Sequence, residues 1–212
     1  MTARTLGIAL VLAVAGAAGG YAVGAVNADE PRTISMAMPV PAASPSYPVN
    51  EYDVQPDPDD PALEPGLPLV AARFRASAGY ALRASVPEGW AKGGDGSMRT
   101  FAIPGANSNT YRLRIGIFTD RQSVGVKRSA RIGALESAED DDEMQNVVVE
   151  DEADDGFVAT YLQNGYRRVT MERFVDLGRT SAYATVAVVG RETDRAGMAD
   201  LLERVSASLR VP

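Results

Sequence analysis

Apolar and polar residues alternate with a period of two along several short segments in the second half of the chain. In residues 111–117 the odd-numbered positions are large and apolar, while positions 112 and 114 are arginine. Successive side chains of a strand point to opposite faces, so this pattern predicts a strand with one buried and one wet face. Related patterns predict further strands at residues 80–86, 99–103, 147–149, 157–162, 166–175 and 181–189. The last of these is apolar on both faces, which favours a central position in a sheet.

Two other segments carry apolar residues at helical spacing. Residues 123–136 begin with Ser123 as a candidate N-cap, although two glycines weaken the pattern. Residues 198–209 carry the apolar stripe of a C-terminal helix that begins near Thr193. Between two predicted strands, Asn164-Gly165 predicts a tight hairpin, because both residues accept positive φ angles. The order of elements predicts an α+β domain, an antiparallel sheet of about six or seven strands with two packed helices.

The first 28 residues have the character of a membrane or export segment. Residues 6–26 contain no charged residue, and a helix of this length is about 32 Å long, close to the thickness of a bilayer core. Arg4 precedes the segment and Asp29 follows it, so the N-terminus is expected in the cytoplasm and the remainder outside. A signal peptide cleaved after Ala28 fits the same residues. We therefore expect either a single-pass membrane anchor or a secreted protein.

Residues 29–68 differ from both neighbouring regions. Ten of the thirteen prolines lie between positions 31 and 68, and large apolar residues are few. Such a composition predicts a disordered Pro- and Asp-rich linker after the hydrophobic helix, because the segment cannot bury enough surface to offset its ordering entropy. On this basis the folded domain is expected to span residues 69–212, and the linker to contribute nothing to its stability.

The element order, the turn Val86-Pro87-Glu88-Gly89-Trp90 and the closing strand and helix resemble the PsbP-like fold. That group includes photosystem assembly subunits, a Ran-binding nuclear transport factor and mycobacterial LpqN-type lipoproteins. Tethered exported proteins of actinobacteria are similar as well. The resemblance covers roughly residues 69–211, supplies no catalytic residue, and implies a binding or assembly scaffold. Unlike LpqN, this chain has no cysteine for lipidation.

Composition removes most catalytic chemistry. The chain contains neither cysteine nor histidine, which excludes thiolate nucleophiles, imidazole bases and the metal sites built from either side chain. Phosphate-binding loops, serine-nucleophile motifs and nucleic-acid-binding motifs are also absent from the predicted domain. We therefore expect a non-enzymatic protein without a cofactor and without a nucleic-acid partner.

Charge is distributed unevenly along the chain. Residues 139–155 hold ten carboxylates and no basic residue, but they lack the alternating ligands and central glycine of a calcium loop. A solvated acidic loop is the expected structure. Although the whole chain has a net charge of −7, residues 66–212 without this segment carry +9. The candidate partner-binding residues are Arg112, Arg114, Lys127, Arg128, Arg131, Arg167 and Arg168.

We hypothesise that this basic surface binds an envelope protein or anionic lipid, while the acidic segment screens it or selects the partner. The alternative is that the arginines are dispersed and only solvated. The preferred function is thus a membrane-tethered extracytoplasmic interaction or scaffold module. Two alternatives stay open: a ligand-binding sensor, which needs a pocket between sheet and helix, and a carboxylate-based enzyme, which needs two carboxylates facing across a cleft.

Overall fold

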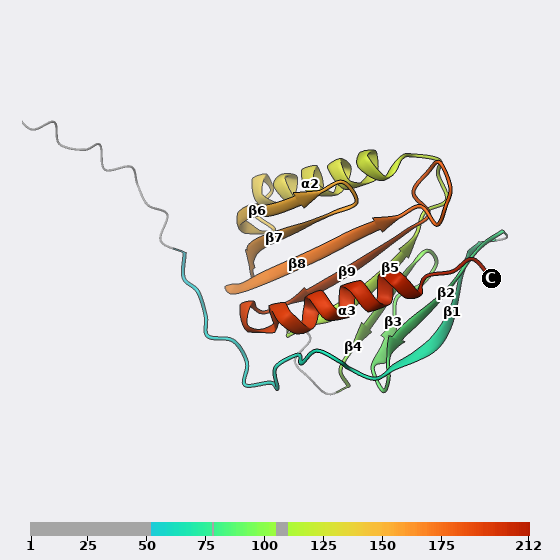
Figure 1. Cartoon of the computed structure of the whole chain (residues 1–212). Helices are drawn as coiled ribbons and strands as arrows, with labels where there is room; N and C mark the ends of the chain where they lie inside the picture. Colours follow the sequence, from blue (N-terminus) through green and yellow to red (C-terminus); the bar gives the residue numbers. More distant parts are fainter. Residues whose placement is uncertain (1–51, 78, 105–109) are drawn as a thin grey trace, which may run out of the picture. The chain divides into compact units, whose positions relative to one another are not determined.

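A computed structural model of the chain describes residues 52–77, 79–104 and 110–212 (Figure 1). The expected membrane segment 6–26 and linker residues 29–51 lie outside these ranges. Within them, no helix has both the length and the hydrophobicity needed to cross a membrane. The strands are β1 (Leu69–Ser77), β2 (Tyr80–Pro87), β3 (Ala91–Gly93), β4 (Met98–Ala102), β5 (Arg112–Ile117), β6 (Gln145–Ala153), β7 (Gly156–Gln163), β8 (Tyr166–Val175) and β9 (Ala184–Gly190). The helices are α2 (Val124–Asp140), the short 3-10 helix η1 (Glu192–Asp194) and α3 (Arg195–Ser208).

The main sheet is antiparallel, with seven strands in the order β3-β4-β5-β9-β8-β7-β6. This confirms the α+β class, and β9 is the central strand that its continuous apolar character predicted. The hairpin between β7 and β8 turns at Asn164 and Gly165, with φ angles of 53° and 80°. These are the positive values expected of a tight hairpin turn.

The two helices cover opposite faces of this sheet. On one face α3 packs on β8 and β9, and the main core gathers Leu113, Val169, Val186 and Leu201 among its buried residues (Figure 1). On the other face α2 packs on β6 and β8 through a smaller cluster centred on Leu135. Ser123 caps α2 by accepting a hydrogen bond from the Val126 N–H, as expected. Because α2 covers only the part of this sheet face that is formed by β6 to β8, the part formed by β5 and β9 remains open.

The membership of the sheet differs from the sequence expectation. The predicted strand 80–86 is β2, which pairs with β1 in a separate two-stranded sheet beside α3. Neither β1 nor the three-residue β3 was predicted. Phe74 is the one buried side chain of β1, and most of the residues around it are alanine or arginine, so the pattern is too weak to recognise. Trp90, after β2, packs against the core with its ring centroid 5.6 Å from that of Tyr111.

The boundary of the linker is a second difference. Residues 52–68, which we call the strap, are packed on the domain although they form no strand or helix. The side chain of Leu63 is 4% exposed and belongs to the main core. Its N–H donates to the buried carboxylate of Asp194 at 2.9 Å, and the Gly66 N–H donates to Asp200 at 2.8 Å. The expectation that all residues before 69 are a free linker is therefore wrong for the strap.

Arg191 explains how a proline-rich segment can be held without regular structure. Its guanidinium donates hydrogen bonds to the carbonyl oxygens of Pro58, Asp60 and Pro61 at 2.9–3.1 Å. An irregular segment leaves its carbonyls without ladder partners, and one guanidinium has five N–H donors to satisfy them. The strap is thus bound through its backbone carbonyl groups. Proline residues can take part because they lack only the N–H group and keep the carbonyl.

The acidic segment 139–155 is not a loop. It forms the end of α2, the edge strand β6 and the turn into β7. Val147 and Val149 pack against the α2 cluster, which explains why the strand forms despite its charge. Three of its carboxylates pair with basic residues: Glu150 with Arg195 at 2.7 Å, Glu152 with Arg128 at 3.1 Å and Asp155 with Arg173 at 3.7 Å. Across the described part of the chain, no three acidic side chains gather in a metal-binding arrangement.

Candidate anion-binding site

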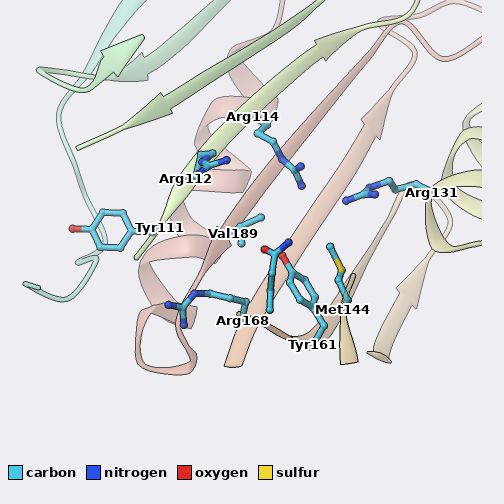
Figure 2. A pocket seen from close by; sticks show the side chains of 9 residues that line it. Tyr111, Arg112, Arg114, Arg131, Met144, Tyr161, Arg168 and Val189 are labelled. Atoms are coloured by element: carbon cyan, nitrogen blue, oxygen red, sulfur yellow. The ribbon is translucent and has the colours of Figure 1, made fainter. Parts of the chain in front are cut away.

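The open part of the α2 face carries a cavity of about 150 Å³. It lies at the start of β5 and β8 and the end of β7 and β9, with Arg131 of α2 on one side. We call it the arginine cavity, because four arginines line it and no lining residue is acidic (Figure 2). Its lining residues are Tyr111, Arg112, Arg114, Arg131, Met144, Tyr161, Gln163, Arg168 and Val189.

The register of the sheet explains why a cavity forms here. Arg114 is paired with Ala187, and Arg112 with Val189 on the central strand. In each row the residue on β9 is shorter than its arginine neighbour on β5. Since side chains of one face stand roughly perpendicular to the sheet, the short residues leave a hollow beside the long ones. The cavity therefore follows from the sequence of β9 and from the limited reach of α2.

Arg114 and Arg131 point toward one another across the cavity, one from β5 and one from α2 (Figure 2). Both interact with Glu172, whose side chain is 4% exposed. The Arg131 Nε donates to its two carboxylate oxygens at 3.0 and 3.2 Å, and an Arg114 nitrogen lies 3.5 Å from one of them. Two guanidiniums thus share a single carboxylate. The positive charge of this pair of arginines is only half compensated by Glu172.

Arg168 is the most buried of the four arginines, with 3% of its surface exposed. Its Nη1 donates to the strap carboxylate of Asp57 at 2.6 Å and to the carbonyl of Arg167 at 2.6 Å. Its Nη2 has no hydrogen-bond partner in the described residues, and less than 1 Å² of this atom is accessible to water. Buried donors are nearly always paired, and leaving one unpaired costs about 1–3 kcal/mol or more when it is charged. Figure 2 shows this guanidinium on the far side of the cavity from Arg131, where it binds the strap.

Tyr161 faces Arg168 from the neighbouring strand β7. Burial raises the pKa of its phenol above the ordinary value, and the nearby positive charges of Arg114 and Arg131 oppose this shift without cancelling it. The phenol therefore stays protonated at neutral pH and can donate a hydrogen bond. Together with the guanidiniums it gives the cavity a lining of donors.

A second cavity, of about 270 Å³, adjoins the first and shares Arg114 and Arg131 with it. Its other lining residues are Met98, Phe118, Lys127, Glu172, Phe174, Thr185 and Ala187. The rings of Phe118 and Phe174 are stacked, with centroids 6.2 Å apart. Lys127 lies over the ring of Phe118 and pairs with Asp120 at 2.5 Å. This second cavity is thus apolar along its wall and basic at its rim, and we call it the aromatic cavity.

Five of the seven candidate residues line these two cavities. Arg112, Arg114, Arg131 and Arg168 meet at the arginine cavity, and Lys127 lies at the aromatic cavity. The other two lie elsewhere. Arg128 donates to the carbonyl of Ala153 and pairs with Glu152, both in the acidic segment. Arg167 is exposed and, by the alternation of β8, belongs to the opposite face from Arg168.

Comparisons with known proteins give no family for this chain. No protein-family model and no curated protein matches it. Among solved structures, the chain is similar to a crystal structure from Bacteroides thetaiotaomicron VPI-5482, with 16% sequence identity and a TM-score of 0.40. The similarity covers 66% of this chain and 48% of that one, so the chain matches about half the length of that protein. Function must therefore be argued from the site itself.

Several residues of the site were not predicted from sequence. Tyr161, Gln163 and Met144 line the arginine cavity, while Glu172 and Asp57 bind its arginines. Glu172 is the single carboxylate of β8, whose other charged residues are arginines, and this is a signal that could have marked it as paired. Asp57 carried no such signal, because it lies in a segment whose composition predicted disorder.

A third cavity, wider and more open at about 450 Å³, lies near the end of β8 and α3. Its lining includes Asp154, Asp155, Asp176 and Glu203 around Arg173. Arg173 pairs with Glu203 at 2.5 Å and with Asp155 at 3.7 Å. Two of the four carboxylates are thus engaged with a cation of the chain itself.

Proposed function

We propose that this domain is a non-catalytic binding module that recognises a phosphate or carboxylate group at the arginine cavity. The observation that carries the proposal is that Arg114 and Arg131 share the single carboxylate of Glu172 at a cavity that Arg112 and Arg168 also line. Planar guanidiniums bind carboxylates and phosphates through paired charge-assisted hydrogen bonds. An anion would supply the negative charge that Glu172 alone does not provide.

The dimensions of the cavity support a small charged group. A volume of about 150 Å³ is comparable to cavities that admit a benzene-sized molecule, so a phosphate or carboxylate fits while a bulky substituent does not. Partly buried surroundings lower the effective dielectric constant, which strengthens the attraction of the arginines for an anion relative to an exposed surface. The anion could be carried by an envelope component or by a soluble molecule.

The absence of catalysis is part of the proposal. Glu172 is the single carboxylate among the described residues that line the two adjoining cavities, and it is bound by arginines. The resemblance to PsbP-like domains, which stays a prediction, implies binding or assembly and supports the same reading.

We expect phosphate binding by the full chain to depend on Arg114, which lines the arginine cavity, and not on Arg167, which lies outside it. Thermal unfolding would be followed at increasing inorganic phosphate, since a ligand of the folded state raises the midpoint by mass action. Arg114→Gln is expected to weaken the fitted affinity at least tenfold, in keeping with a hydrogen bond to a charged group.

The matched control is Arg167→Gln, which removes the same charge from the opposite face and should alter the affinity by less than twofold. It also accounts for the general stabilisation that phosphate gives to folded proteins. Equal responses of the two variants to phosphate would contradict the proposed site.

We also propose that the domain lies outside the cytoplasm and is tethered by residues 6–26. The protein should then fractionate with membranes when cells are broken and washed at high salt. Recovery in the medium of a mature form beginning at Asp29 would instead establish cleavage and secretion.

A further inference from the structure

The aromatic cavity indicates which kind of anion the domain takes. It adjoins the arginine cavity at Arg114 and Arg131, so one ligand can contact both cavities. Ligand pockets usually exceed about 300 Å³. Neither cavity reaches this size alone, but the two together do. The unit that matches an ordinary ligand is therefore the pair of cavities.

The wall of the aromatic cavity suits an apolar group. Phe118 and Phe174 present stacked rings, and Ala187 on the central strand leaves the space between them and the arginines open. Met98 lies beside the cavity with 41% of its surface exposed. Its unbranched thioether can adjust to a ring placed next to it. Apolar material bound here would leave water while its charged end stays at the rim.

Thr185 provides an independent observation in the same cavity. Its side chain is 7% exposed, and its Oγ1 has no hydrogen-bond partner in the described residues. A buried hydroxyl without a partner is unusual, as is the unpaired nitrogen of Arg168 in the adjoining cavity. Two unpaired buried polar atoms thus lie along one continuous pair of cavities.

We infer that the site binds a small amphipathic anion, with its phosphate or carboxylate head at Arg114 and Arg131 and a ring-sized apolar body in the aromatic cavity. This inference rests on the proposed anion-binding function and specifies its ligand class. Charge complementarity places the head, because no lining residue of the arginine cavity is acidic. The phenylalanine wall places the body, because burial there removes apolar surface from water.

The test compares phenyl phosphate with inorganic phosphate on the full chain, using affinities fitted from thermal unfolding as above. Phenyl phosphate is expected to bind about tenfold tighter or more, which corresponds to burying one aromatic ring. Ala187→Leu would fill the aromatic cavity and should erase this gain.

A second variant protects the test against misfolding of Ala187→Leu. Met98→Ala alters an exposed residue at the strand edge, so the fold should be retained. It is expected to reduce the gain for phenyl phosphate about threefold and to leave inorganic phosphate binding unchanged. A gain that survives both substitutions would overturn the assignment of the aromatic cavity.

The outcomes separate the two proposals. If inorganic phosphate binds through Arg114 but phenyl phosphate binds no tighter, the site recognises an anionic group alone and the amphipathic ligand is excluded. A macromolecular partner that presents the anion would then be the remaining occupant. If inorganic phosphate does not bind and phenyl phosphate binds equally well to Arg114→Gln, the proposed function itself fails.

Discussion

Replacing Asp194 with asparagine is expected to lower the free energy of unfolding by about 3–5 kcal/mol, the usual result of removing one member of a buried ion pair. Asp194 is 0% exposed and its partner Arg191 is 5% exposed. The carboxylate accepts hydrogen bonds from the Arg191 Nε at 2.7 Å, the Arg191 Nη2 at 2.9 Å and the Leu63 N–H at 2.9 Å. The asparagine side chain would place its NH2 group against one of these N–H groups, so that two donors face each other. It would also leave the charge of the Arg191 guanidinium uncompensated.

The loss should depend on pH in a defined direction. Burial alone would raise the pKa of Asp194, but hydrogen bonds from the Arg191 side chain and from backbone N–H groups outweigh it and hold the pKa below the ordinary value. A carboxyl with a lowered pKa in the folded state contributes stability above the unfolded-state pKa of about 3.9, and loses it as pH falls through the folded-state value. The gap between wild type and Asp194→Asn should therefore narrow below about pH 4.

Asp200→Asn is the matched control, because Asp200 also binds the strap from α3 but lies at the surface with its side chain 29% exposed. It should cost no more than about 1 kcal/mol in chemical denaturation at neutral pH. If Asp194→Asn lowered the free energy of unfolding by no more than this control, the Arg191–Asp194 pair would not be stabilising the packed position of the strap in solution.

Gly197→Ala is expected to destabilise the protein by about 3 kcal/mol, against the usual trend for glycine in a helix. A Cβ at this position of α3 would lie 1.8 Å from the carbonyl oxygen of Leu63 and 2.5 Å from its carbonyl carbon. Backbone cannot yield as the end of a flexible side chain can. The strap would have to move away, which exposes Leu63 and breaks its hydrogen bond to Asp194.

Gly133→Ala is expected to change the free energy of unfolding in the opposite direction in the same assay. Gly133 lies inside α2, and a Cβ there would meet nothing within 4 Å. Alanine should therefore raise the free energy of unfolding by about 1 kcal/mol through helix propensity alone. Stabilisation by both substitutions would show that the strap does not rest on α3.

Periodicity was a sufficient guide where one face of an element is uniformly buried. It placed β5, β9 and the C-terminal helix, and local turn chemistry placed the hairpin at Gly165. It failed where stability comes from a distant partner. Residues 58–61 owe their position to Arg191, which lies 130–133 residues later in the chain, and no local pattern reveals such a contact.

The residues of the candidate site were likewise predicted only in part. Alternation on β5 identified Arg112 and Arg114 on one face, but the register between strands decides which other arginines join them. Arg167 and Arg168 are adjacent in sequence and lie on opposite faces, so charge density along the chain could not separate them. The aromatic cavity depends on Ala187, a small residue whose importance comes only from its longer neighbours.

The position of β6 at the edge of the sheet suggests a structural role for the acidic segment that its charge alone did not indicate. Its outer side is a row of backbone groups without a partner strand, the arrangement through which sheets of different molecules join. Glu150, Asp151 and Glu152 follow one another along this edge, and the pairing with β7 is irregular between Val149 and Asp151.

A second copy docking along β6 would bring two such runs of carboxylates together across a distorted edge. Repulsion and poor register oppose that contact at neutral pH. We therefore expect this acidic and irregular edge to disfavour edge-to-edge pairing between two copies of the sheet.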